Sequence, residues 1–116
     1  MPAWRYRAFY GDPADGLGAH AMHDSMTGGT AGLVAVGRPL RITGVALVWT
    51  EHPGWLELWR RNRLVRLRDL SLVGPDVRFD ELDELLEAGE ALAGRRWITG
   101  GSGPYPLRIT LQYQEV

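Results

Sequence analysis

The stretch from residue 42 to residue 73 constrains the fold more than any other part of the chain. Residues 42–50 (ITGVALVWT) are almost wholly apolar or β-branched, which is typical of a strand covered on both faces. Residues 51–54 (EHPG) then supply a turn, because proline fixes its own φ and glycine allows a positive one. A second polar segment, residues 60–63, contains Asn62, a natural turn residue. The stretch therefore predicts three or four short antiparallel strands joined by tight turns.

Strict alternation marks the strand that follows the first turn. Leu56 and Leu58 point to one side, and Trp55, Glu57 and Trp59 point to the other. Tryptophans beside a carboxylate have two interpretations at this point. Either a loop or helix covers this second face, or the face is a contact surface for another subunit or partner. The sequence leaves both open.

Composition narrows the class of protein. At 116 residues the chain is expected to be a single domain over 1–116, and its 15 glycines and 7 prolines favour a fold rich in turns. A net charge of −1 gives no general attraction to nucleic acid or acidic membranes. The absence of cysteine excludes a disulfide framework and thiolate chemistry. The sequence has no apolar run of about 18 residues and no signal-peptide pattern at its start, so we expect a cytosolic origin.

The first 32 residues are expected to form an N-terminal strand or arm followed by a long loop. Residues 1–10 (MPAWRYRAFY) alternate aromatic and arginine side chains, and such an arm is expected to pair with a sheet edge or a neighbouring molecule. Binding of single-stranded nucleic acid is the weaker alternative, because no further basic aromatic face supports it. Residues 11–32 contain several turn signals, and long loops of this kind are often functional or ordered by a partner.

Metal and catalytic motifs are not recognisable. His20, His23 and Asp24 have a spacing that permits a chelate if the segment is helical, but no convincing third ligand lies nearby. Neither a calcium loop, a phosphate-binding glycine loop nor a nucleophile elbow is present. We therefore expect no cofactor, no metal and no enzymatic activity, and a small enzyme that uses His20, His23 or His52 ranks last.

Residues 79–93 predict one amphipathic helix. Apolar residues recur at helical spacing, acidic residues occupy the opposite face, and Gly94 is a suitable terminator. The acidic face is expected to be solvated, or to meet a group of arginines within the molecule or across a subunit boundary. These arginines are Arg60, Arg61, Arg63, Arg66 and Arg68. With the alternating strand at residues 107–114, the fold class is mainly β: an antiparallel sandwich with one short helix at 79–93.

The order of these elements resembles a family of small phage virion proteins. An "ITGV" strand at 42–45 leads to a hairpin of the type "LELW…LVRL", and the glycine-rich loop 100–106 leads to "PLRITLQY". The chain from 40 to 116 is similar in this respect to single-domain virion proteins with a jelly-roll or tumour-necrosis-factor-like β-sandwich. The resemblance implies a capsid decoration (cement) protein that sits as a trimer on the head, or a small collar, head–tail or tail component. The acidic helix departs from a minimal jelly roll.

The expected function is thus that of a non-enzymatic virion structural protein made in the host cytoplasm. It would self-associate, with a trimer favoured, and bind a capsid or other virion protein, without nucleic acid or membrane. The alternative is a carbohydrate- or host-receptor-binding sandwich, in which aromatic rings stack on sugars and the 11–32 loop shapes the site. The predicted contact residues are Trp4, Arg5, Tyr6, Phe9, Trp55, Trp59, Arg60 and Arg61.

Overall fold

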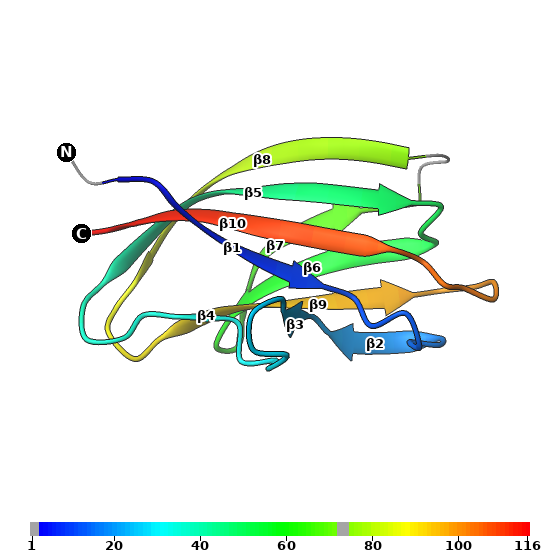
Figure 1. The fold of residues 1–116 in the computed structure, drawn as a ribbon, viewed down its shortest axis with the longest axis horizontal. Helices are drawn as coiled ribbons and strands as arrows, with labels where there is room; N and C mark the ends of the chain where they lie inside the picture. The colour runs from blue at the N-terminus through cyan, green and yellow to red at the C-terminus, as the bar shows by residue number, and fades with distance from the viewer. Residues whose placement is uncertain (1–2, 72–74) are drawn as a thin grey trace.

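The computed structural model describes residues 3–71 and 75–116, which form two antiparallel sheets packed face to face (Figure 1). The first, sheet A, has the order β3-β1-β10-β5-β8. Its strands are β3 (His23–Asp24), β1 (Arg5–Tyr10), β10 (Leu107–Glu115), β5 (Leu40–Thr50) and β8 (Pro75–Leu86).

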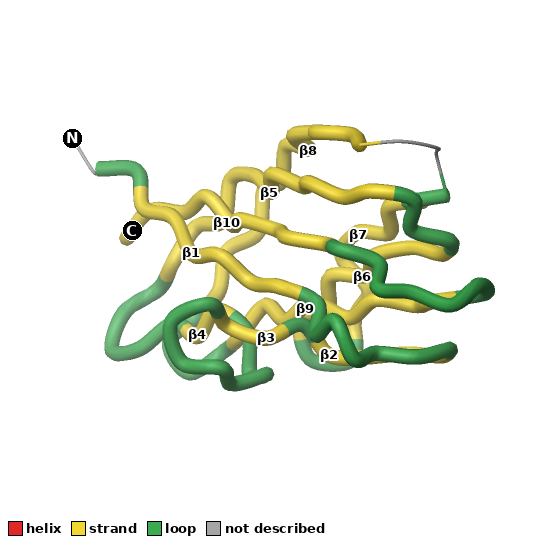
Figure 2. The backbone as a smooth tube through the Cα atoms, turned by 45° about the vertical axis from the view of Figure 1, so that its right-hand side comes forward, coloured by secondary structure: helices red, strands yellow, loops and turns green. Residues whose placement is uncertain are grey.

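The second sheet, sheet B, has the order β2-β9-β6-β7, and β4 pairs with another part of β9. Its strands are β2 (Gly18–Ala21), β9 (Ala91–Ile98), β6 (Gly54–Arg60), β7 (Arg63–Asp69) and β4 (Leu33–Val34). Figure 2 shows strands joined by loops and no helix in the described residues, so none of them forms a helix able to cross a membrane. The predicted antiparallel, mainly β fold is confirmed.

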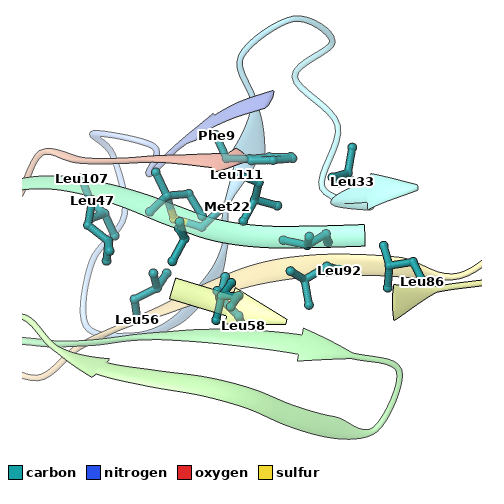
Figure 3. Packing of buried hydrophobic residues seen from close by; sticks show 14 of the residues in the cluster. Phe9, Met22, Leu33, Leu47, Leu56, Leu58, Leu86, Leu92, Leu107 and Leu111 are labelled. Atoms are coloured by element: carbon teal, nitrogen blue, oxygen red, sulfur yellow. The ribbon is translucent and has the colours of Figure 1, made fainter. Parts of the chain in front are cut away.

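The core lies between the two sheets and is built from alternate residues of facing strands (Figure 3). Leu56 and Leu58 of β6 point into it, as their spacing predicts, and face residues such as Leu47 and Leu111 of sheet A. In β5 the inward parity changes at an irregularity in its pairing with β8, between Ile42 and Gly44. This bulge lets an almost wholly apolar strand keep one inner and one outer face.

The predicted helix at 79–93 is wrong. Residues 75–86 are strand β8, paired along its length with β5, and residues 91–98 are strand β9. Leu82 and Leu86 fit helical spacing, but they also fit a period of two, and as strand residues both face the core. Long-range pairing with β5 satisfies the backbone of this segment, which decides between the two periods.

The expectation that the acids of this segment are solvated is wrong for three of them, which take the alternative arrangement and meet the arginines within one molecule. Arg68 binds the carboxylate of buried Asp80 through two of its nitrogens, Nε and Nη2, and Nε lies 2.8 Å from Oδ2. Glu84 accepts from Arg63 at 2.7 Å, and Glu90 accepts from Arg60 at 2.6 Å. These pairs link β6 and β7 of sheet B to the β8 edge of sheet A and to the turn after β8, so acids that looked solvated stabilise the join between the sheets.

The N-terminal region is more ordered than the sequence indicates. Strand β1 lies inside sheet A between β3 and β10, and the expected loop at 11–32 contains the short strands β2 and β3. Asp24 fixes the turn after β3, because it accepts hydrogen bonds from the Arg7 side chain at 2.8 Å and from the Met26 amide at 2.8 Å. Burial opposes ionisation of Asp24, but these hydrogen bonds outweigh it and hold its pKa below the usual value.

Candidate functional site

Three indoles gather on the outer face of sheet B. Trp55 pairs with Trp97 across β6 and β9, and Glu57 pairs with Arg95, so these side chains stand next to one another on the same face. Trp59 follows two residues after Glu57 and shares that face. We call Trp55, Trp59, Trp97, Glu57 and Arg95 the tryptophan platform.

The Glu57 carboxylate holds the platform together. Its Oε2 accepts a hydrogen bond from Trp55 Nε1 at 2.9 Å, and its Oε1 accepts one from Trp59 Nε1 at 2.8 Å. Arg95 donates to the same Oε1 from Nε at 3.0 Å and from a terminal nitrogen at 2.8 Å. Glu57 is 7% exposed, although it lies on the outward face, because the indoles and the guanidinium close over it.

Ring contacts complete the arrangement. The Trp55 and Trp97 rings stack with their centroids 5.6 Å apart and an angle of 24° between their planes. The Arg95 guanidinium carbon lies 5.1 Å from the Trp59 ring centroid and 5.9 Å from that of Trp97, within the range of cation–π attraction. Each indole is thereby held by at least one partner in the platform, so the aromatic surface is ordered before any ligand arrives.

The charge of Glu57 is secured by these neighbours. Burial favours the protonated form, but the hydrogen bonds from Trp55, Trp59 and Arg95 outweigh it and hold the Glu57 pKa below its usual value. The carboxylate is therefore ionised at neutral pH. Its role is to fix donors, since four hydrogen bonds occupy its two oxygens.

The outer face of sheet B is open. Leu67 lies opposite Glu57 and Leu64 lies opposite Trp59, and these β7 side chains are 51% and 41% exposed. The exposure of these two side chains means that no described element covers the β7 part of this face. Of the two interpretations that the sequence leaves open, a complete cover over this face is not found among the described residues, and a contact surface stays a prediction.

Two hollows flank the platform. One, of about 400 Å³, is lined by Trp59, Arg61, Asn62 and Arg95. The other, of about 430 Å³, lies at the opposite end of β6 and is lined by Gly54, Trp55, Leu67, Asp69, Ser71 and Thr99. The platform therefore runs between a cationic end and an end that carries a carboxylate and hydroxyl groups.

Arg61 lies beside the platform, in the hollow that Trp59 lines, whereas the other predicted contact residues are not gathered there. Trp4 and Tyr6 are 51% and 62% exposed at the start of sheet A, and Arg5 pairs with Glu115 at 3.9 Å. Phe9 is buried in the core, because β1 is an interior strand and its odd residues near this point face inward, so Phe9 is excluded as a contact residue. Arg60 bonds to Glu84 and Glu90, and exposed Arg61 pairs with Glu90 at 3.2 Å.

Sequence reasoning missed Trp97 and Arg95, which lie about 40 residues from β6 along the chain. Their alternation within β9 places both on one side, but the face is recognisable only once β9 is known to pair with β6. The histidine group is occupied by local contacts: His20 Nε2 lies 2.8 Å from the Gly16 carbonyl oxygen and His23 Nδ1 lies 3.1 Å from that of Gly28. Among residues 3–71 and 75–116, no three metal-binding side chains come together.

A second polar group lies inside the sandwich, beneath the loops that follow β1 and β9. Arg96 is 1% exposed and donates to Asp15 Oδ2 at 3.1 Å and to the Asp12 carbonyl oxygen at 2.8 Å. His52 is also 1% exposed, and its ring centroid lies 6.0 Å from that of Tyr105. Burial, with the nearby Arg96 charge, lowers the His52 pKa to about 4. This neutral imidazole belongs to the packing of the loops and lies outside the platform.

Comparisons of the chain with protein-family models, with curated proteins and with solved structures find no significant match.

Proposed function

We propose that the chain is a non-enzymatic structural protein of a virion, which self-associates and binds a protein lattice through the tryptophan platform. The observation that supports this most directly is a nearly buried carboxylate that holds two indoles by hydrogen bonds, with a third indole stacked on one of them. Tryptophan and arginine are enriched among the residues that contribute most to protein–protein binding. Side chains ordered in advance lose less conformational entropy when a partner binds.

The strand order supports the structural part of the proposal. Sheet A has the order β1-β10-β5-β8 and sheet B the order β2-β9-β6-β7, with β3 and β4 as short additions. Two four-stranded sheets arranged in this way support the proposal of an eight-stranded jelly roll. Viral capsid domains and lectins both use this architecture. A fold of this kind hosts several functions, so the platform rather than the topology has to supply the binding argument.

Lattice binding suits such a small face. Many identical copies on one particle make modest contacts effective when the subunits are also joined to one another. The platform offers apolar area in its indoles and a charged rim in Arg61 and Asp69 at its two ends. This combination of an aromatic centre and a polar rim is typical of protein interfaces.

The test is to follow the chain in particles produced by the genome that encodes it. Wild-type chain, a Trp55→Ala/Trp59→Ala variant and a Val36→Ala control on an exposed loop are expressed in that background, and particles are purified by density gradient. We expect wild type and the control in particles at many copies, and the platform variant mostly in the soluble fraction while its circular dichroism still shows the folded sandwich. A wild-type chain missing from particles would refute the proposed function.

A carbohydrate or host receptor is the second candidate, and the two hollows favour it. Each places amide, hydroxyl or charged groups beside an indole, which is the arrangement that recognises a sugar ring on an aromatic face. A glycan array with the wild-type chain separates the candidates. Specific sugar binding that Trp59→Ala abolishes would favour the receptor-binding role, and no binding above the variant favours the lattice role.

A further inference from the structure

The outer face of sheet A carries a second exposed apolar surface, on the opposite side of the sandwich from the platform. In Figure 1 its strands β1 and β10 lie in front of β6 and β9. Register places Phe79 beside Ala46, and Val77 beside Val48, on neighbouring strands. Val48, Val77 and Phe79 are 47%, 73% and 51% exposed. We call Tyr6, Ala46, Val48, Val77, Phe79, Glu81 and Arg108 the sheet A face.

At the centre of this face the Phe79 ring lies against the backbone of β5. A Cβ atom added to Gly44 would lie 2.1 Å from Cζ of Phe79, so the Phe79 ring lies directly over the glycine backbone. Glycine in a strand commonly marks such a close approach. The missing side chain at Gly44 thus lets a large ring lie along the sheet.

Two opposite charges flank the apolar centre symmetrically. Arg108 lies opposite Val48 in the strand register, two residues after Ala46 along β5. Glu81 lies opposite Gly44, two residues before Ala46. Arg108 lies one strand to one side of β5, and Glu81 lies one strand to the other side. Ala46 is therefore midway between the two charges. Within residues 3–71 and 75–116, neither side chain forms an ion pair.

We propose that a second copy of this chain packs against the sheet A face about a two-fold axis that passes over Ala46. The axis lies in the plane of the interface and is perpendicular to the line from Arg108 to Glu81. Rotation about it places Arg108 of each copy opposite Glu81 of the other copy. The same operation brings Phe79 near the partner's Val48. A two-fold interface requires such self-complementarity, because each residue contact occurs twice.

The dimensions allow a stable pair. The Cα trace extends 43 × 25 Å along its two longest axes, and the view down the shortest axis shows the strands of sheet A spread across that plane (Figure 1). A face of this size can supply the ~800 Å² per partner that stable interfaces typically bury. Two sheets packed in this way keep the ~10 Å separation of a sandwich, with Phe79 and Val48 filling the space between them.

The pair specifies the self-association that the proposed function includes, but it is tested separately. A pair is also distinct from the trimer that the resemblance implies. If the platform binds no lattice, the sheet A face still predicts a pair in solution. If the chain is found in particles as a trimer that lacks this contact, the proposed function survives and the pair does not.

The experiment is a charge exchange read by light scattering over a concentration series. We expect the purified chain to have twice its 12.9 kDa mass, or a six-chain mass built from three such pairs. Arg108→Glu and Glu81→Arg should each weaken pairing by at least about tenfold, since each puts like charges together at two symmetric places. The double variant Arg108→Glu/Glu81→Arg should recover the wild-type affinity to within about threefold.

Glu87→Arg, on an exposed turn, is the matched control and should leave the mass unchanged. Circular dichroism establishes that every variant is folded, which separates loss of pairing from loss of structure. A monomer at all concentrations, a trimer that the charge reversals do not affect, or a double variant that stays as weak as the single ones would overturn the proposal.

Discussion

Replacement of Glu57 by glutamine tests whether this carboxylate holds the tryptophan platform in place. In Glu57→Gln the amide oxygen can take the place of Oε1 and accept from Trp59 and Arg95, as Glu57 does at 2.8–3.0 Å. The amide nitrogen then replaces Oε2 and faces Trp55 Nε1, so two donors meet where a 2.9 Å hydrogen bond stood.

The expected cost follows from these contacts. Loss of the Trp55 hydrogen bond at a nearly buried site is worth roughly 1 kcal/mol. The remaining bonds change from charged to neutral, which weakens them. Because the Arg95 side chain is 43% exposed, water screens its share, and we add only about 1 kcal/mol for this change. The free energy of unfolding should fall by about 2 kcal/mol in total.

Urea unfolding followed by circular dichroism measures this fall. The midpoint should drop by roughly 1 M without a change in slope, because m-values of domains this small lie near 1–3 kcal/mol/M. The ring contact of Trp55 with Trp97 should also loosen, which near-ultraviolet circular dichroism detects. Glu87→Gln, on an exposed turn, is the control and should move the midpoint little. If Glu57→Gln matches Glu87→Gln in both readouts, the carboxylate does not order the platform.

Three further perturbations have defined outcomes. The pKa of His52 in the folded state is lowered from 6.5 to about 4, so the free energy of unfolding should fall by at most about 3 kcal/mol as the pH drops from 6.5 to 4. His52→Leu should flatten this pH dependence, which urea titrations measure. Arg68→Leu leaves buried Asp80 unpaired and should lower the free energy of unfolding by about 3 kcal/mol. Arg68→Leu/Asp80→Leu should recover most of this loss. If the double variant is as unstable as the single one, the unpaired charge is not the cause. Gly54→Ala should lower the free energy of unfolding, measured by thermal unfolding, by about 3 kcal/mol or more. The φ angle of Gly54 is +137°, and the new Cβ would lie 1.8 Å from the Trp97 carbonyl oxygen. A change below about 1 kcal/mol would contradict this geometry.

Sequence patterns predicted the strands best where a polar and an apolar side alternate. Residues 107–114 have one apolar and one polar side, and residues 55–59 have leucines on one side and two tryptophans with Glu57 on the other; both segments are strands with the predicted inward residues. Residues 79–93 failed because Leu82 and Leu86 satisfy both periods and the acids looked solvent-facing. Buried Asp80 is compatible with a strand only because Arg68, from another sheet, neutralises it.

The sequence predicted only the part of the tryptophan platform that lies on β6. Trp55, Glu57 and Trp59 share a side of one strand by their spacing alone, since side chains alternate along any strand. Trp97 and Arg95 join them through pairing between β6 and β9, which no local pattern specifies. Phe9 is the opposite case: the sequence predicted a contact residue, but β1 lies between β3 and β10 and the Phe9 side chain is buried in the core.

By itself, the sequence determined that this chain builds antiparallel strands, which side of several strands is apolar, and that two tryptophans stand beside a carboxylate. The tertiary structure alone decided which strands are neighbours, that the acid-rich segment is a strand, and that Trp97 and Arg95 join the two tryptophans beside Glu57. The physical reason is range: side-chain alternation is a property of consecutive residues, whereas strand partners and the neutralisation of buried charges depend on residues far apart in the chain.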